Sequence, residues 1–207
     1  RHVGYSNIGT FEFLVRVSDS GEAGSFAFIE TNARLQVEHT VTEVVTGVDV
    51  VQTQIQLAQG ESLSDIGLDS QEMINPRGFA IHTRVNMETL FSSGNLRPSG
   101  GMLISYDPPT GPGVRTDGFG YSGYTTNSLF DSLLAKVIAY SPSPQFERAV
   151  GKSLNLLSEF RIEGVDTNIG FLKNVLNHPG FLDGSVHTRW VDENLKTLAV
   201  VDESDGD

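Results

Sequence analysis

The sequence predicts an α+β protein, in which strands and helices occupy separate stretches of the chain. Residues 78–87 (GFAIHTRVNM) alternate with a period of two, as a half-buried strand does. Residues 144–160 carry an apolar stripe at helical spacing. Near the start, the strand-like runs 10–17 (TFEFLVRV) and 25–30 (SFAFIE) are separated by turn-forming residues, so they favour an antiparallel hairpin.

Composition narrows the class of protein. A chain of 207 residues can bury a core in one domain or in two small ones. It contains no cysteine, which excludes disulfides, a thiol nucleophile and zinc–thiolate sites. A net charge of -12 argues against general nucleic-acid binding, because phosphate contacts need clustered Lys and Arg. No run of about 18 apolar residues and no secretory signal is visible, so we expect no membrane partner and a cytoplasmic location.

The first hairpin contains an unusual acid. Glu12 stands between two phenylalanines in a strand, where a carboxylate is costly to bury unless it is paired or bound to a metal. The second strand leads into a run in which every second residue is polar: Glu30, Asn32, Arg34, Gln36 and Glu38. In an extended chain all five side chains would lie along one face.

This polar run suits a metal and an oxyanion together. A hard cation such as Mg²⁺ prefers carboxylate and carbonyl oxygens, which Glu12, Glu30 and Asn32 offer. The guanidinium of Arg34 can grip a planar anion in bidentate fashion, and Glu38 can act as a general base on it. A ladder of surface ion pairs is the alternative interpretation of the same pattern.

The remaining elements follow in order. Residues 48–60 predict a structural helix that stops at Gly60, and the polar connector 61–77 is the best domain boundary. After the strand at 78–87, a region rich in Gly and Pro predicts short strands at 102–106 and 114–116. The last predicted elements are a strand at 132–140 and helices at 144–160 and 168–177, with Thr167 as the N-cap of the final helix.

The polar run FIETNARLQVEHTVTEVVTGVDVV closely resembles the ATP-grasp signature of biotin carboxylases. The segments GTFEFLV, FAIHTRVN, LRPSGG, GVRTDG and FDSLLAKVI match the same family in the same order. The resemblance covers residues 4 to 195 and places the chain in the C-terminal half of a biotin carboxylase module. It implies the end of an ATP-grasp domain in residues 1–70, the biotin carboxylase C-terminal domain in 71–196, and an acidic tail or linker in 197–207.

The resemblance also implies a role for each matching residue. Glu12 and Glu30 would bind ATP phosphates and Mg²⁺ or Mn²⁺, with Asn32 as the third metal ligand and Leu14 lining the adenine pocket. Arg34, Gln36 and the backbone of Val37 would bind bicarbonate, with Arg34 also catalytic. Glu38 would be the catalytic base, and Arg84 would reach the same anion and stabilise enolised biotin. Arg115 falls where dimerising members of the family place an interface arginine, so a homodimer is one assembly that the resemblance allows. Asp131 and Lys136 match family positions without an assigned role, whereas His39, His82 and Trp190 are interpreted as structural.

The implied activity is ATP- and bicarbonate-dependent carboxylation of biotin on a carrier, in an acyl-CoA, acetyl-CoA, pyruvate or urea carboxylase. The implied partners are a biotin carboxyl carrier domain and a carboxyltransferase, on the same or a separate chain. Arg1 is not preceded by Met, and the family's glycine-rich lid and phosphate-binding lysines have no counterpart, so we expect a piece of a longer protein that is inactive alone. Such a piece would expose a strand edge that can pair with another copy. The alternatives are another ATP-grasp ligase of the carbamoyl-phosphate type and a non-catalytic assembly or regulatory domain.

Overall fold

The computed structural model describes residues 4–18, 22–127 and 131–199. The chain divides into two compact units, Arg1–Pro76 and Arg77–Asp207, and the break lies inside the polar connector 61–77. The assignment of residues 1–70 and 71–196 to named domains stays a prediction. Within the described ranges, no helix combines the length and the apolar character that crossing a membrane requires.

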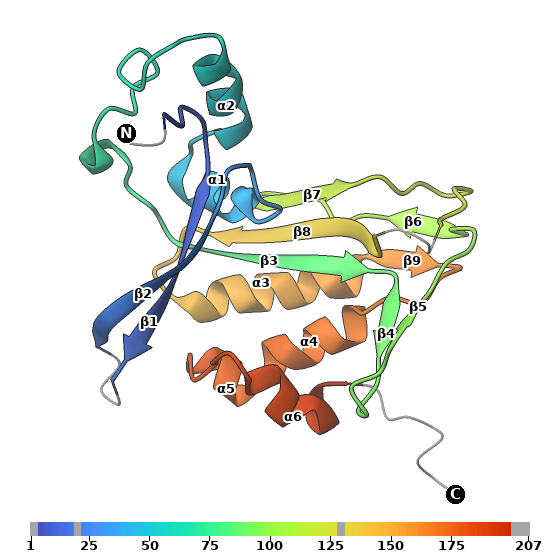
Figure 1. Cartoon of the computed structure of the whole chain (residues 1–207). Helices are drawn as coiled ribbons and strands as arrows, with labels where there is room; N and C mark the ends of the chain where they lie inside the picture. The colour runs from blue at the N-terminus through green and yellow to red at the C-terminus, as the bar shows by residue number, and fades with distance from the viewer. Residues whose placement is uncertain (1–3, 19–21, 128–130, 200–207) are drawn as a thin grey trace, which may run out of the picture. The chain divides into compact units, whose positions relative to one another are not determined.

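The first unit is built on a two-stranded antiparallel hairpin of β1 (Thr10–Val17) and β2 (Ala23–Asn32) (Figure 1). Two helices follow, α1 (His39–Thr46) and α2 (Val50–Ala58), and then a short 3₁₀ helix, η1 (Gln71–Met73). α1 ends at Gly47, which adopts φ 75°, a left-handed conformation that glycine takes at little cost. The helix predicted at 48–60 is confirmed as α2. The helix α1 was not predicted.

Little of this first unit is buried. Among its described residues only Thr40 and Thr53 are buried, whereas Phe26 of the hairpin is 72% exposed. Aromatic rings of Phe13, Phe26 and Phe28 touch edge to face, with centroids 5.7 Å apart in each pair with Phe13. Apolar side chains of α2 are likewise exposed, among them Val51 and Ile55. The unit does not enclose a hydrophobic core of its own.

The second unit contains the core. Its central sheet has the antiparallel order β3 (Phe79–Asn86), β8 (Leu133–Ser141) and β7 (Val114–Gly118). One face is covered by α3 (Phe146–Glu159), as Figure 1 shows, through a continuous apolar cluster. This cluster includes Val85 and Val137 of the sheet and Val150 and Leu157 of the helix. The alternation predicted along residues 78–87 is confirmed, because one phase of β3 faces this core and the other contains Arg84.

Smaller elements complete the second unit. Short ribbons pair β4 (Glu88–Leu90) with β5 (Leu96–Pro98), and β6 (Ser105–Asp107) with β9 (Arg161–Glu163). Below α3 lie α4 (Ile169–Asn177), α5 (Pro179–Leu182) and α6 (Trp190–Leu198) (Figure 1). Trp190 is buried and packs edge to face on His178, with the two ring centroids 4.9 Å apart, as expected of a packing residue. Helix α6 extends two residues into the segment expected to be a tail, and residues 200–207 lie outside the described residues.

Three local predictions are corrected by the structure. The strand expected to carry polar side chains from Glu30 to Glu38 ends at Asn32, because the chain bends and then turns into α1. The N-cap of α4 is Asn168 rather than Thr167. The strand predicted at 102–106 is reduced to β6, with an isolated bridge between Met102 and Thr125. The α+β class itself is confirmed.

Candidate active site

Two carboxylates face each other across the first hairpin. Glu12 of β1 is the direct register partner of Glu30 of β2. The register shifts immediately afterwards, since Phe13 pairs with Phe28 and leaves Ile29 as an extra residue in β2. Such a bulge re-aims the side chains on either side of it. Like charges directly opposite one another destabilise a strand pair, so this arrangement needs donors or a cation beside it.

Carboxamide groups supply the donors. Asn32 Nδ2 donates to Glu30 Oε1 at 2.8 Å and to Glu12 Oε1 at 3.0 Å. Gln36 Nε2 donates to the same Glu12 oxygen at 3.0 Å. One amide therefore bridges the two acids, and a second holds Glu12 from the loop after β2. Gln36 reaches Glu12 only because the strand stops at Asn32 and the loop folds back.

The corrected path of the chain separates the expected row of polar residues. Glu30 and Asn32 lie on the strand, Arg34 lies in a bend, and Glu38 is the N-cap residue of α1. Arg34 is exposed, and its Nη1 donates to the carbonyl of Leu35 at 3.1 Å. The residues therefore surround a corner of the chain instead of following one straight face.

A cleft of about 490 Å³ opens at this corner. Its lining includes Gln36, Glu38 and His39 from the segment after β2, and residues 8–11 at the start of β1. Gln36 therefore takes part both in the cleft wall and in the acid pair, which joins the two features. Leu14, expected at the adenine, lies on β1 and is 55% exposed.

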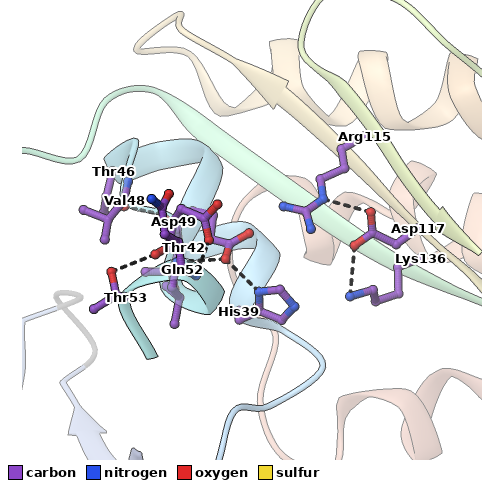
Figure 2. Close-up of polar contacts among 12 residues, drawn as sticks. His39, Thr42, Thr46, Val48, Asp49, Gln52, Thr53, Arg115, Asp117 and Lys136 are labelled. Carbon is purple, nitrogen blue, oxygen red and sulfur yellow. Dashed lines mark hydrogen bonds and ion pairs between the residues drawn. The ribbon is translucent and has the colours of Figure 1, made fainter. Parts of the chain in front are cut away.

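Helix α1 is anchored by polar contacts at its junction with α2, which Figure 2 shows. Glu43 Oε1 lies 3.0 Å from His39 Nδ1 and accepts the N–H of Val50 at 3.0 Å. Asp49 caps α2 by accepting from Gln52 N at 2.7 Å. These bonds fix the first turn of α1, and with it the adjoining Glu38. The expectation that His39 is structural agrees with this contact.

The second unit presents a cationic row on the sheet face opposite α3. Arg84 of β3 pairs in register with Lys136 of β8, and Lys136 pairs with Asp117 of β7. Asp117 accepts from Arg115 Nε at 2.9 Å and lies 3.2 Å from Lys136 Nζ (Figure 2). Burial raises the pKa of Asp117, but hydrogen bonds and charge attraction from Arg115 and Lys136 outweigh it and hold that pKa below 3.8. The row thus brings together the cations of Arg84, Lys136 and Arg115, and Asp117 pairs with the last two.

The acid pair fits a hard divalent cation. No group of three or more His, Asp or Glu side chains in the described ranges is placed to hold a metal. Two carboxylates and one carboxamide do converge at Glu12, Glu30 and Asn32, and both kinds of group can offer oxygen ligands to Mg²⁺. In the structure the nitrogen of Asn32 faces the acids, so a cation would require its amide to turn and present the oxygen.

Comparison with known proteins identifies the family. Residues 82–193 match the biotin carboxylase C-terminal domain. The chain belongs to the biotin carboxylase family. Residues 1–66 match the ATP-binding domain of the carbamoyl-phosphate synthase L chain. Each of the two units of this biotin carboxylase chain therefore matches a known domain family.

Similar proteins support the same assignment. Pyruvate carboxylase 1 of Caenorhabditis elegans is 47% identical over 195 residues, which is 94% of this chain and 16% of that protein. A single-chain, multi-domain long-chain acyl-CoA carboxylase has a TM-score of 0.85 at 43% identity, over 95% of this chain and 21% of its own. The biotin carboxylase domain of Hydrogenobacter thermophilus 2-oxoglutarate carboxylase has a TM-score of 0.83 at 37% identity, over 97% of this chain and 42% of its own. The chain thus spans about a sixth of the C. elegans protein.

Sequence reasoning missed two features of the site. One is the bulge at Ile29, which has no sequence signal because Phe-Ala-Phe-Ile reads as an uninterrupted strand. The other is Asp117, whose contacts with Arg115 and Lys136 depend on the pairing of β7 with β8. The GVRTDG motif contains Asp117, but the motif alone does not reveal its partners.

Proposed function

We propose that this chain forms the floor of a biotin carboxylase active site, which carboxylates carrier-bound biotin with ATP and bicarbonate through carboxyphosphate. The observation that carries the proposal is the Glu12–Glu30 pair bridged by Asn32, in a chain of this family. Two opposed carboxylates repel, and the amides of Asn32 and Gln36 donate to them without neutralising their charge, so a bound cation would stabilise the pair further.

Glu12, Glu30 and Asn32 would hold Mg²⁺ or Mn²⁺ together with the phosphates of ATP. A metal ion bound there would offset negative charge on the phosphoryl oxygens of ATP. Leu14 offers an exposed apolar side chain on the strand that carries Glu12, as contact with an adenine ring requires.

The bend after β2 would hold bicarbonate. Arg34 offers a planar fork of donors for the carboxylate-like anion, and Gln36 and the backbone of Val37 add further donors. Glu38, at the edge of the cleft, would take the proton of bicarbonate, and the freed oxygen then attacks the γ-phosphorus as ADP leaves. Arg84 would bind the same anion and stabilise the negative oxygen of enolised biotin.

The neighbours support this use of the residues. The 2-oxoglutarate carboxylase domain is described as a dimer in complex with MgADP, ADP and bicarbonate. The similar proteins act on pyruvate, 2-oxoglutarate or long-chain acyl-CoA, so one carboxylation chemistry precedes different acceptors. The partners would be a biotin carrier domain and a carboxyltransferase, and the carboxyltransferase would select the acceptor. In a homodimer, Arg115 would contribute to the interface.

The test is bicarbonate-dependent release of ADP by the full-length protein that carries this sequence. Glu38→Gln removes the base, and we expect kcat to fall by about 10²-fold or more. Glu12→Gln removes a metal ligand, and we expect a higher requirement for Mg²⁺. Glu72→Gln, an exposed acid in η1, is the matched control and should leave turnover unchanged. Wild-type turnover by Glu38→Gln would contradict the proposal, and ADP release that required ammonia instead of biotin would indicate a carbamoyl-phosphate ligase.

A further inference from the structure

Arg84 lies on a strand whose outer edge is closed by a side chain. β3 is an edge strand of the sheet, with β8 on its inner side. On its outer side Asn168 Oδ1 accepts the N–H of Asn86 at 2.9 Å, and Asn168 Nδ2 donates to the carbonyl of Arg84 at 3.1 Å. The N–H of Asn168 also donates to the carbonyl of Asn86 at 3.1 Å. One residue thus holds three backbone groups, much as a neighbouring strand would.

Asn168 is buried and does not act as an ordinary helix cap. Its position is the N-cap of α4, where an Asn side chain normally accepts a backbone N–H of the first turn. No such bond forms here, because both amide atoms are engaged with β3. The first turn of α4 thus lacks a side-chain capping bond, and the side chain of Asn168 stabilises the backbone of β3 instead.

The loop that delivers Asn168 is itself fixed. Asp166 N donates to Ser99 Oγ at 2.9 Å, and Ser99 N donates to the carbonyl of Met87 at 2.8 Å. Gly164 adopts φ +100°, and a Cβ there would lie 2.0 Å from the carbonyl oxygen of Met102. Loop and strand end are therefore joined at two places, one through Ser99 and one through Asn168.

The position of Arg84 explains why its backbone needs support. Its register partner is Lys136, whose charge is paired with Asp117 of β7 at 3.2 Å. Because β3 is an edge strand, a neighbouring strand holds only one side of its backbone, and that strand is β8. Asn168 holds the other side by donating to the carbonyl of Arg84 itself, which restricts the direction of the Cα–Cβ bond of Arg84.

We propose that Asn168 is a positioning residue for Arg84 and thereby for the anion that Arg84 binds. This inference rests on the proposed function, in which Arg84 contacts bicarbonate and enolised biotin. A displacement of about 1 Å in a positioned group can reduce turnover by about 10²-fold. Loss of Asn168 therefore acts on the step that uses Arg84 and leaves binding of MgATP by the first unit largely unchanged.

The experiment measures kinetics of the full-length protein that carries this sequence. For Asn168→Ala we expect kcat/KM for bicarbonate to fall about 10- to 100-fold, with KM for MgATP changed by less than about twofold. Asn174→Ala is the matched control, because Asn174 of α4 also donates to a backbone carbonyl, that of Leu198 at 2.8 Å, away from β3. Asn174→Ala also removes a side-chain bond of α4, but it should keep the wild-type KM for bicarbonate.

A double variant tests whether Asn168 acts through Arg84. Once Arg84→Ala is present, adding Asn168→Ala should cause no further loss. Additive losses, or equal kinetics for Asn168→Ala and Asn174→Ala, would overturn the inference and leave the proposed function intact. Full bicarbonate-dependent turnover by Arg84→Ala would overturn both.

A second substitution covers failure of Asn168→Ala to fold. Asn168→Asp has nearly the same shape and favours the N-cap position. Its carboxylate can accept from Asn86 but cannot donate to the carbonyl of Arg84. We expect the same selective loss for bicarbonate, and wild-type kinetics for a folded Asn168→Asp variant would overturn the inference.

Discussion

At the scale of residues, the acid pair of the hairpin is the most demanding feature of the first unit. Glu12 and Glu30 each accept a hydrogen bond from Asn32, and Glu12 accepts a second from Gln36. These amides satisfy the carboxylates but do not neutralise their charge. The same oxygens can therefore exchange amide donors for a cation, and Asn32 controls the exchange because its amide presents either nitrogen or oxygen.

Asn32→Asp tests this exchange without measuring activity. In the presence of a chelator the full-length protein should lose about 1 kcal/mol of stability, because a third carboxylate replaces two donated hydrogen bonds. Added Mg²⁺ should then raise its Tm by more than it raises that of wild type. The measurement is thermal unfolding with and without Mg²⁺, and Asn32→Ala is the control that loses the donors without gaining a ligand. Equal Mg²⁺ responses of all three proteins would argue against a cation at this pair.

Asp117 gives the second unit a pH dependence. Its pKa is below 3.8 when folded, despite the raising effect of burial, because Arg115 and Lys136 bind the carboxylate. The unfolded chain therefore takes up the proton first as pH falls, so this stabilisation is full well above pH 3.8 and is lost as pH falls through the folded pKa.

Asp117→Asn should accordingly be less stable than wild type at neutral pH, by on the order of 1 kcal/mol or less for a partly exposed pair. The difference should shrink as the pH falls below 3.8. Denaturant unfolding of the full-length protein across this range measures it. A difference that stayed constant with pH would show that packing, and not charge, explains the effect of the substitution.

At the scale of elements, α3 and the loop before α4 differ in whether their glycine can be replaced by a residue with a side chain. Gly151 lies inside α3, and a Cβ added there would meet nothing within 4 Å. Gly164 lies after β9 with φ +100°, where a Cβ would meet backbone atoms of residues 102 and 104. The helix tolerates a side chain that the loop does not, because only the loop is pressed against another backbone.

Gly151→Ala should therefore stabilise the protein by about 1 kcal/mol, since alanine restricts the unfolded chain and favours the helix. Gly164→Ala should destabilise it by about 3 kcal/mol, because the clash with Met102 cannot be relieved by a side-chain rotation. Denaturant midpoints of the two variants provide the measurement. Stabilisation by Gly164→Ala would contradict the close packing of this loop.

At the scale of the whole molecule, burial differs sharply between the two units. Every buried hydrophobic side chain among the described residues lies in the second unit, and most of them belong to the clusters around β8 and α3. The first unit leaves its aromatic hairpin exposed. Stability of an element follows the apolar surface that it buries, so the two units cannot be equally stable when the chain stands alone.

Limited proteolysis of the isolated 207-residue chain should therefore cleave first within residues 4–76 and leave 77–199 as a resistant core. Amide exchange should be slowest in β3, β8 and α3 and fast throughout β1 and β2. The exposed edges of the hairpin should also promote association between copies as concentration rises. Equal protection of the two units would contradict this difference in burial.

The sequence determined much of this protein by itself. Periodicity located β3, β8, α2, α3 and α4 to within about three residues, because in each the side-chain pattern repeats with the period of the element. The spacing of Glu12, Glu30 and Asn32 predicted a carboxylate–amide cluster, which the structure brings together. Family motifs supplied the expected roles of Arg34, Glu38 and Arg84, and these roles stay proposals.

Only the tertiary structure decided how the site is assembled. The alternation from Glu30 to Glu38 predicted one extended strand face. In the structure the strand ends at Asn32, and the loop that follows folds back so that Gln36 donates a hydrogen bond to Glu12. The bulge at Ile29 and the closure of β3 by Asn168 join residues that are far apart in the sequence or follow no period. Local patterns report the period of an element, whereas bends, bulges and edge contacts arise from hydrogen bonds that form only once separate segments meet.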